Sequence, residues 1–240
     1  MSVEGVTATH ESEIQVSKFN VLTIPADAKG CQFYLEQYKP FRLASLQRDA
    51  HAFGSTYARE IAFDDDAWLN RVKNPLATTF VAVRSDNNQV VASTSMIGPL
   101  PKTSSPVSNP YQVVSQTAPP VSSTSNNGSN ENDDNKANDE PLYFQMAAVY
   151  TSPEARGRGL AKALIRTATD EARSRAQEQG RALVLSVVVY AANSAAISVY
   201  ERCGFVKSAE EPKLVFNPLK NTSEKELEMY FGGKEVVKSA

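Results

Sequence analysis

Residues 142–180 read LYFQMAAVYTSPEARGRGLAKALIRTATDEARSRAQEQG. The first ten of these residues, 142–151, are mostly apolar and rich in residues that favour extended backbone, so they predict a buried strand. From residue 158 onward apolar side chains recur at helical spacing as far as Gly180, which predicts a long amphipathic helix closed by a glycine. The segment is therefore a strand, a short turn and a helix.

The turn between the strand and the helix, residues 156–161, has the sequence RGRGLA and is suited to binding an anion. Gly157 and Gly159 let the chain turn tightly and leave the amide groups open to a ligand. The helix that follows offers unpaired N–H groups and the positive end of its dipole. Arg156 and Arg158 add donors that match phosphate oxygens. The spacing fits neither the Walker loop nor the dinucleotide fingerprint, so the sequence predicts a phosphate-binding turn of another kind.

The flanking sequence predicts further strands and helices. Expected strands lie at Phe19–Ile24, 78–84, 89–97 and 181–190, with more near the end of the chain, including 225–231. Residues 85–88 are typical of a hairpin turn between the second and third of these strands. Expected helices lie at 35–53, with an interruption at Pro40, after the capping residue Asp64, and at 193–205.

Residues 102–140 differ in composition from the rest of the chain. Most of them are Ser, Thr, Asn, Pro or acidic residues, and 7 of the 13 prolines fall between positions 99 and 141. Such a segment buries too little apolar surface to offset the entropy of ordering it. We therefore expect a flexible tail at 1–12 and a single domain over 13–235, which a disordered insertion interrupts at 102–140. A flap over a substrate and a partner-docking segment are the alternatives for this insertion.

The overall composition excludes several classes of protein. The 25 Lys and Arg residues against 27 Asp and Glu residues give a net charge of -2, which argues against nucleic-acid binding as the main role and slightly favours a cationic ligand. Two Cys and two His residues show neither a disulfide framework nor the spacing of metal ligands. The sequence has no signal-peptide pattern and no apolar run of membrane-spanning length, so it predicts a cytoplasmic protein, with the nucleus left open.

Two motifs together resemble those of one enzyme family, the GCN5-related N-acetyltransferases (the GNAT superfamily). The first is Arg156-x-x-Gly159-x-Ala161, and the second is Asn193-x-x-Ala196-x-x-x-Tyr200 followed by Cys203-Gly-Phe. Residues 49–60 are also similar to a segment of many small members of that family. The resemblance extends over about 14–231. It implies the GNAT fold: a central, mixed, mostly antiparallel twisted sheet of about six to seven strands flanked by about four helices, splayed between the strands at 142–151 and 181–190.

The resemblance also implies a cofactor site for acetyl-CoA, a co-substrate that needs no metal. The pantetheine arm would lie between the splayed strands and pair with the backbone near Val149 and Thr151. Asn193 would bind pantetheine or cap its helix. The pyrophosphate would lie on the turn formed by Arg156, Gly157, Arg158, Gly159, Leu160 and Ala161.

The implied reaction is direct acetyl transfer to an amine in a ternary complex. Tyr200 would be the general acid, because a phenol stays protonated at neutral pH and can donate to the departing CoA thiolate. The general base is left open among Glu60, Asp64, Tyr143, Gln145 and a chain of water molecules. The acceptor is a small-molecule or peptide amine of undetermined identity, and the oligomeric state is also open. The alternative is a non-catalytic CoA-binding regulatory module in which the insertion docks a partner.

Overall fold

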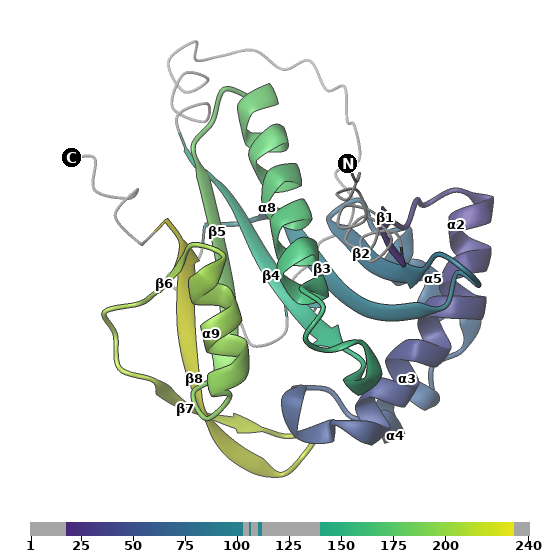
Figure 1. The fold of residues 1–240 in the computed structure, drawn as a ribbon. Helices are drawn as coiled ribbons and strands as arrows, with labels where there is room; N and C mark the ends of the chain where they lie inside the picture. The colour runs from purple at the N-terminus through teal and green to yellow at the C-terminus, as the bar shows by residue number, and fades with distance from the viewer. Residues whose placement is uncertain (1–17, 103–105, 107–109, 112–139, 233–240) are drawn as a thin grey trace, which may run out of the picture.

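The structure is a computed structural model that describes residues 18–102, 106, 110, 111 and 140–232 (Figure 1). The predicted tail at 1–12 lies outside these ranges, as does most of the predicted insertion at 102–140. The first half of the chain forms β1 (Phe19–Thr23), α2 (Ala28–Phe33), a π-helix (Tyr34–Tyr38), α3 (Lys39–Arg48), a 3-10 turn (Ala50–Ala52), α4 (Tyr57–Ile61), α5 (Asp65–Val72), β2 (Ala77–Arg84) and β3 (Val90–Leu100). The second half forms β4 (Leu142–Thr151), a 3-10 turn (Pro153–Ala155), α8 (Leu160–Glu178), β5 (Leu183–Tyr190), α9 (Ser194–Arg202), β6 (Phe205–Lys207), β7 (Lys213–Asn217) and β8 (Thr222–Phe231).

The strands of the described residues form one sheet in the order β1-β2-β3-β4-β5-β8-β6, and β7 pairs with β8 beside this path. Every neighbouring pair is antiparallel except β4 and β5, which are parallel. This arrangement confirms the mixed, mostly antiparallel sheet that the sequence predicts. The described strands number eight instead of six to seven, because the short strand β7 adds to the C-terminal end.

Helices cover both faces of the sheet, and strand β2 shows how the sequence divides between them. Phe80 and Ala82 belong to the larger core, which packs under α8 and α9. Val81 and Val83 belong to a second core with aromatic residues of the N-terminal helices, including Trp68 of α5. Successive side chains of a strand point to opposite faces, so one apolar strand supplies both cores.

The strongest local patterns agree closely with the structure. The strand predicted at 142–151 is β4, residue for residue, and the hairpin of β2 and β3 turns where the sequence predicts. The side chain of Asp64 accepts a hydrogen bond of 2.8 Å from the Ala67 N–H and so caps α5. These features depend on neighbours in the sequence, which a local pattern can record.

Pro40 does not separate two helices as the sequence predicts. The chain runs from α2 through the π-helix into α3, with Pro40 in the first turn of α3. The N–H of Lys39 bonds to the Tyr34 carbonyl, five residues back, in the manner of a π-helix. Proline has no N–H to donate, and in the first turn of a helix that loss is tolerated. The wider turn therefore carries the helix past the proline.

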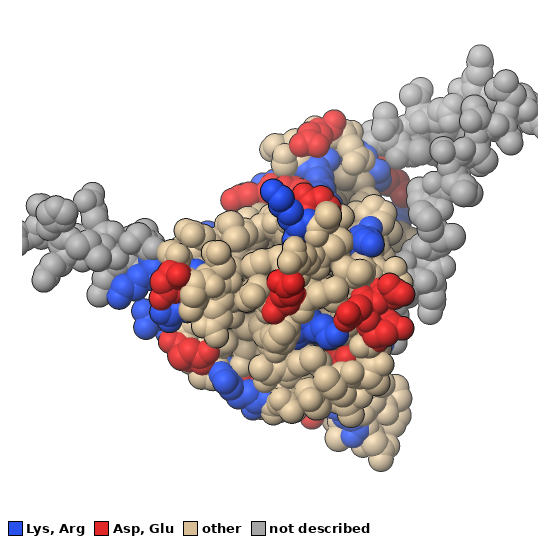
Figure 2. Space-filling view, turned by 90° about the vertical axis from the view of Figure 1, so that its right-hand side faces the viewer, with Lys and Arg blue, Asp and Glu red and all other residues tan. Residues whose placement is uncertain are grey.

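The surface over the N-terminal helices carries charges of both signs. Figure 2 shows Lys and Arg side chains interspersed with Asp and Glu side chains on this face. Among the described helices, none is both long and apolar enough to span a membrane.

Candidate functional site

Strands β4 and β5 pair over only half of β4. Their parallel register runs from Leu142 opposite Leu183 to Met146 opposite Val187. Beyond Met146, β4 continues to Thr151 and pairs with β3 alone. This confirms the splay predicted between the strands at 142–151 and 181–190.

A bulge in β4 lies at the point of separation. Ser93 and Ser95 of β3 face Tyr150 and Ala147, so β4 has one extra residue here. Ala148 has a φ of 54°, which is uncommon for a residue other than glycine. A bulge of this kind bends the strand that carries it and ends its regular pairing. The sequence of β4 gives no local sign of it.

The end of β4 turns one backbone edge away from β3. Ser152 donates its N–H to the Val91 carbonyl at 2.8 Å, on the side of β3. The Thr151 carbonyl instead accepts from Arg156 Nε at 3.0 Å. Since backbone groups alternate in direction along a strand, Val149 and Thr151 present their N–H and C=O groups to the gap between β4 and β5.

The turn at 156–161 leads directly into α8 and is open. Gly157 and Gly159 have φ values of 75° and 77°, and a Cβ added at either position would meet no atom within 4 Å. The glycines are therefore needed for the backbone conformation and not to avoid a clash. No side chain caps α8, and its first intrahelical bond runs from the Ala163 N–H to the Gly159 carbonyl. The N–H groups of Leu160 and Ala161 precede that bond and face outward at the positive end of the helix dipole.

The two arginines of the turn have different surroundings. Arg156 Nη2 donates to Asp49 Oδ2 at 2.7 Å, and Tyr150 donates its hydroxyl to the same oxygen at 2.7 Å. Burial opposes the charge on Asp49, but these two hydrogen bonds lower the pKa of its carboxyl group. The Arg158 guanidinium lies 5.6 Å from the centre of the Phe19 ring. Sequence analysis missed Asp49, because nothing near it in the sequence indicates a partner more than 100 residues away.

A cleft of about 1640 Å³ extends from the open edge of β4 to the N-terminal helices. Its lining includes Val149 on β4, the C-terminal half of β5, and both Asn193 and Tyr200. On the other side the lining comes from α3, α4, α5 and the segment before α4. The structure thus brings the predicted residues Val149, Asn193 and Tyr200 to one cavity, whereas the turn at 156–161 lies outside its lining.

Asn193 and Tyr200 belong to the same short helix, α9. The side chain of Asn193 accepts a hydrogen bond of 3.1 Å from the Ala196 N–H and caps the helix. Tyr200 is 5% exposed and packs edge-on against Phe205, with ring centres 5.6 Å apart. Burial, with a smaller contribution from Cys203, raises the pKa of the Tyr200 phenol well above its ordinary value. Its proton is therefore held throughout the neutral range.

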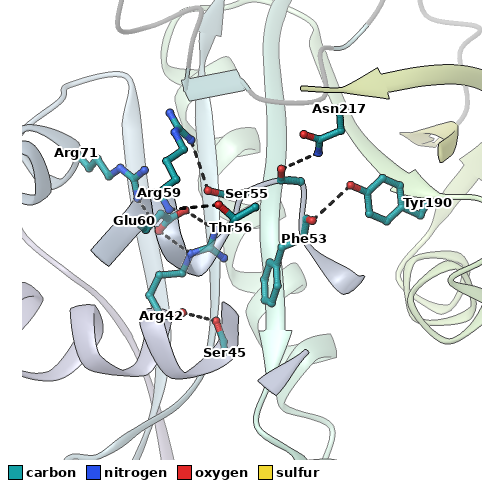
Figure 3. A network of polar contacts seen from close by, with 11 residues as sticks. Arg42, Ser45, Phe53, Ser55, Thr56, Arg59, Glu60, Arg71, Tyr190 and Asn217 are labelled. Atoms are coloured by element: carbon teal, nitrogen blue, oxygen red, sulfur yellow. Dashed lines mark hydrogen bonds and ion pairs between the residues drawn. The ribbon is translucent and has the colours of Figure 1, made fainter. Parts of the chain in front are cut away.

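A buried ion-pair network forms the opposite wall of the cleft (Figure 3). Glu60 is 1% exposed and accepts from Arg42 Nε at 3.1 Å and Arg42 Nη2 at 2.9 Å. Arg71 Nη1 donates to the same carboxylate at 3.2 Å. Burial opposes ionisation of Glu60, but the two guanidinium groups outweigh it and lower its pKa to about 2.

The structure places the four side chains that sequence analysis weighed as general bases in different settings. Glu60 is held as an anion by two arginines, so it is a poor proton acceptor near neutral pH. Asp64 is exposed and caps α5, and it does not line the cleft. Gln145 lines the cleft but carries no basic group, and Tyr143 lies on β4 outside the lining.

The C-terminal strands close the cleft against the N-terminal half of the chain. The Tyr190 hydroxyl donates to the Phe53 carbonyl at 3.4 Å, and Asn217 Nδ2 donates to the Gly54 carbonyl at 2.8 Å (Figure 3). Lys220 Nζ donates to the Ala50 carbonyl at 2.7 Å. These three bonds join segments more than 130 residues apart in the sequence.

Within the described ranges, no group of three or more His, Cys, Asp and Glu side chains is placed to hold a metal ion. The predicted cofactor-binding elements are instead backbone groups on β4 and the open turn before α8.

Comparisons with known proteins give solved structures of similar fold and one matching family model. Arabidopsis thaliana NAA60 in complex with acetyl-CoA has a similar fold, with a TM-score of 0.53 and 16% identity over 88% of this chain and 98% of that one. Spermidine N-acetyltransferase from Vibrio cholerae, in complex with CoA and spermine, gives a TM-score of 0.50 and 13% identity over 89% and 95% of the two chains. A search of curated proteins gave no match. The model of the acetyltransferase (GNAT) family matches residues 42–205, more than half of the sequence, so the chain belongs to this family.

Proposed function

We propose that the protein transfers an acetyl group from acetyl-CoA directly to an amine in a ternary complex. The observation that carries this proposal is the unpaired edge of β4, which lies in the same cleft as the protonated phenol of Tyr200. Solved structures of similar fold contain acetyl-CoA or CoA, which supports the choice of co-substrate.

The residues present fit acetyl-CoA at two places. The N–H and C=O groups of Val149 and the N–H group of Thr151 offer hydrogen bonds to the amides of a pantetheine arm lying in the gap between β4 and β5. The open N–H groups at 157–161 suit a pyrophosphate at the start of α8. Arg158 adds a guanidinium beside this turn. Arg156 fixes the turn by its bonds to Asp49 and to the Thr151 carbonyl.

Bound in this way, acetyl-CoA supplies a reactive thioester, and the chain supplies the groups around it. A backbone N–H of the free β4 edge would stabilise negative charge on the thioester oxygen. Tyr200 would hold a proton on its hydroxyl oxygen for the departing thiolate. Asn193 would keep α9, and so Tyr200, in position through its helix cap. None of the four side chains weighed above is assigned as the base, and a chain of water molecules within the cleft would carry the proton of the acceptor amine to solvent.

The turn before α8 can be tested with a matched pair of glycine substitutions. Gly159→Ala adds a methyl group to the open turn and opposes the left-handed backbone conformation that holds its N–H groups in place. We expect acetyl-CoA affinity to fall about tenfold, equivalent to one lost charge-assisted hydrogen bond. Isothermal titration calorimetry with acetyl-CoA measures this change.

Gly180→Ala is the control for the strain that the substitution introduces. Gly180 also has a positive φ, 62°, and open space around it, but it follows the far end of α8, about 28 Å away. Each alanine should cost about 1–2 kcal/mol of folding stability, because both adopt the left-handed conformation. Equal acetyl-CoA affinity in the two variants would contradict the proposed phosphate site.

A further inference from the structure

The wall of the cleft formed by α3, α4 and α5 carries an excess of positive charge. Arg42, Arg59 and Arg71 all line the cleft there, and Glu60 is the carboxylate that lies among them. Three guanidinium charges against one carboxylate charge leave a net charge of +2 on this wall. The slightly negative charge of the whole chain, which favours a cationic ligand, does not describe this part of the molecule.

Two buried tyrosines beside this wall do not balance its charge. Tyr34 and Tyr38 are buried beside the arginines, at 1% and 3% exposure. Burial raises the pKa of Tyr38 to about 12 and raises that of Tyr34 as well, so both phenols stay neutral. Among carboxylates of the described residues, Glu60 is the one that raises the pKa of both Arg42 and Arg71 against the effect of burial.

Glu60 has no capacity left for a third guanidinium. Its two oxygens already accept two bonds from Arg42 and one from Arg71, and the Ser55 side chain adds another. A carboxylate offers about four acceptor positions, so this one is fully used. Arg59 bonds instead to the Ser55 hydroxyl at 3.4 Å, and its charge has no carboxylate partner among these contacts.

Phe63 brings Arg59 and Arg71 together at the surface of the cleft. Their guanidinium groups lie 5.4 Å and 4.9 Å from the centre of its ring. The side chain of Arg71 is 18% exposed, so it is largely removed from water. Glu60 is the one carboxylate among the described contacts of these groups: Arg71 shares it with Arg42, and Arg59 does not bond to it. Guanidinium groups bind planar carboxylates through paired hydrogen bonds, so a further carboxylate fits beside Arg59 and Arg71.

We propose that the acceptor is a primary amine that also carries a carboxylate, and that this carboxylate binds to Arg59 and Arg71 beside Phe63. The proposal rests on the proposed acetyl transfer and adds the chemical class of the acceptor. Glu226 and Glu228, the acidic residues of the lining outside this network, lie on β8. Lys213 of β7 also lines the cleft there and pairs with Glu228, which leaves a net charge of -1 on that side. The charge on the two sides of the cleft therefore differs, as an acceptor with a negative group at one end and an amine at the other requires.

The test compares amino acids with the amines that result from their decarboxylation. The full chain, saturated with CoA, is titrated by calorimetry with L-phenylalanine and 2-phenylethylamine, L-histidine and histamine, and L-lysine and cadaverine. We expect an amino acid to bind about 10- to 100-fold more tightly than its own decarboxylated partner, the range for hydrogen bonds between charged groups. Equal binding within every pair, tighter binding of the amines, or no binding of any compound would overturn the proposal.

Three variants locate the carboxylate. Arg59→Gln and Arg71→Gln should each remove most of the preference for the amino acid. Arg59 does not bond to Glu60, so its replacement tests the site even if Arg71→Gln lowers folding stability. Arg84→Gln is the control, because Arg84 is an exposed residue of β2 that pairs with Asp86, and it should keep the full preference. A preference that survives in all three variants would place the carboxylate elsewhere and overturn the assignment.

Acetyl-CoA affinity and CoA release, measured on the same preparations, separate the two proposals. If acetyl-CoA binds and amines are acetylated without a preference for the carboxylate, the inference about the acceptor fails and acetyl transfer stands. If acetyl-CoA does not bind, the proposed function fails and the inference fails with it.

Discussion

Replacing Tyr200 by phenylalanine should lower turnover by about 10²- to 10⁴-fold, the usual contribution of a general acid, and should leave acetyl-CoA affinity nearly unchanged. The substitution removes only the hydroxyl group, and the packing of the ring against Phe205 is kept. Because burial raises the pKa of Tyr200 above its ordinary value of about 10, the wild-type phenol is protonated at every pH at which the protein would be assayed. Steady-state measurement of CoA release, with calorimetry for acetyl-CoA affinity, separates the two effects.

Tyr57→Phe is the matched control for this experiment. Tyr57 is a partly buried tyrosine that packs against the core cluster containing Phe53 and does not line the cleft, so loss of its hydroxyl should leave turnover unaffected. A Tyr200→Phe protein with wild-type turnover would rule out Tyr200 as the acid and leave it a packing residue of α9.

Glu60→Gln should lower the free energy of unfolding by about 3–5 kcal/mol, the cost of breaking a buried ion pair from one side. The change keeps the size of the side chain but leaves the largely buried guanidinium groups of Arg42 and Arg71 without a negative partner. Urea unfolding followed by circular dichroism measures the loss. Glu154→Gln breaks an exposed pair with Arg48, whose side chain is 51% exposed, and should cost less than about 1 kcal/mol. Similar losses in the two variants would contradict the role of Glu60.

The same ion pairs predict how stability depends on pH. Arg42 and Arg71 hold the pKa of Glu60 at about 2, below its ordinary value of 4.5, despite the opposing effect of burial. Since the folded pKa is the lower one, the stabilisation is complete above about pH 4.5 and is lost as the pH falls toward 2. The loss from this group is about 3 kcal/mol, and Glu60→Gln should remove that part of the acid dependence. A variant with the wild-type pH profile would show that another group is responsible.

Local patterns predicted the elements of the site that lie close together in the sequence. The strand β4, the turn at 156–161 and the helix α8 are consecutive, so their spacing already indicates their arrangement. The same holds for Asn193 and the helix it caps. The splay of β4 from β5 came from the resemblance to a known family, since nothing in the sequence of β4 marks the bulge at Ala148.

Contacts between distant segments were not predictable in this way. Asp49 meets Arg156 across 107 positions, and Glu60 meets Arg42 across 18. Sequence analysis weighed Glu60 as a base because it could see the carboxyl group but not the two arginines that hold its charge. The π-helix before Pro40 was not predictable for the same reason. Packing of the continuous helix against the sheet outweighs the local signal of the proline for an interruption.

The bonds that close the cleft have a consequence for how its specificity can change. Tyr190, Asn217 and Lys220 all donate to main-chain carbonyl groups, of Phe53, Gly54 and Ala50. Every amino acid supplies such a carbonyl, so these bonds do not depend on which side chains the segment 50–54 carries. Substitutions at the exposed positions of this segment therefore leave its attachment to the C-terminal strands in place. Phe53 itself is 5% exposed and belongs to a core cluster, so the positions of this segment that can vary without loss of folding stability are its more exposed ones.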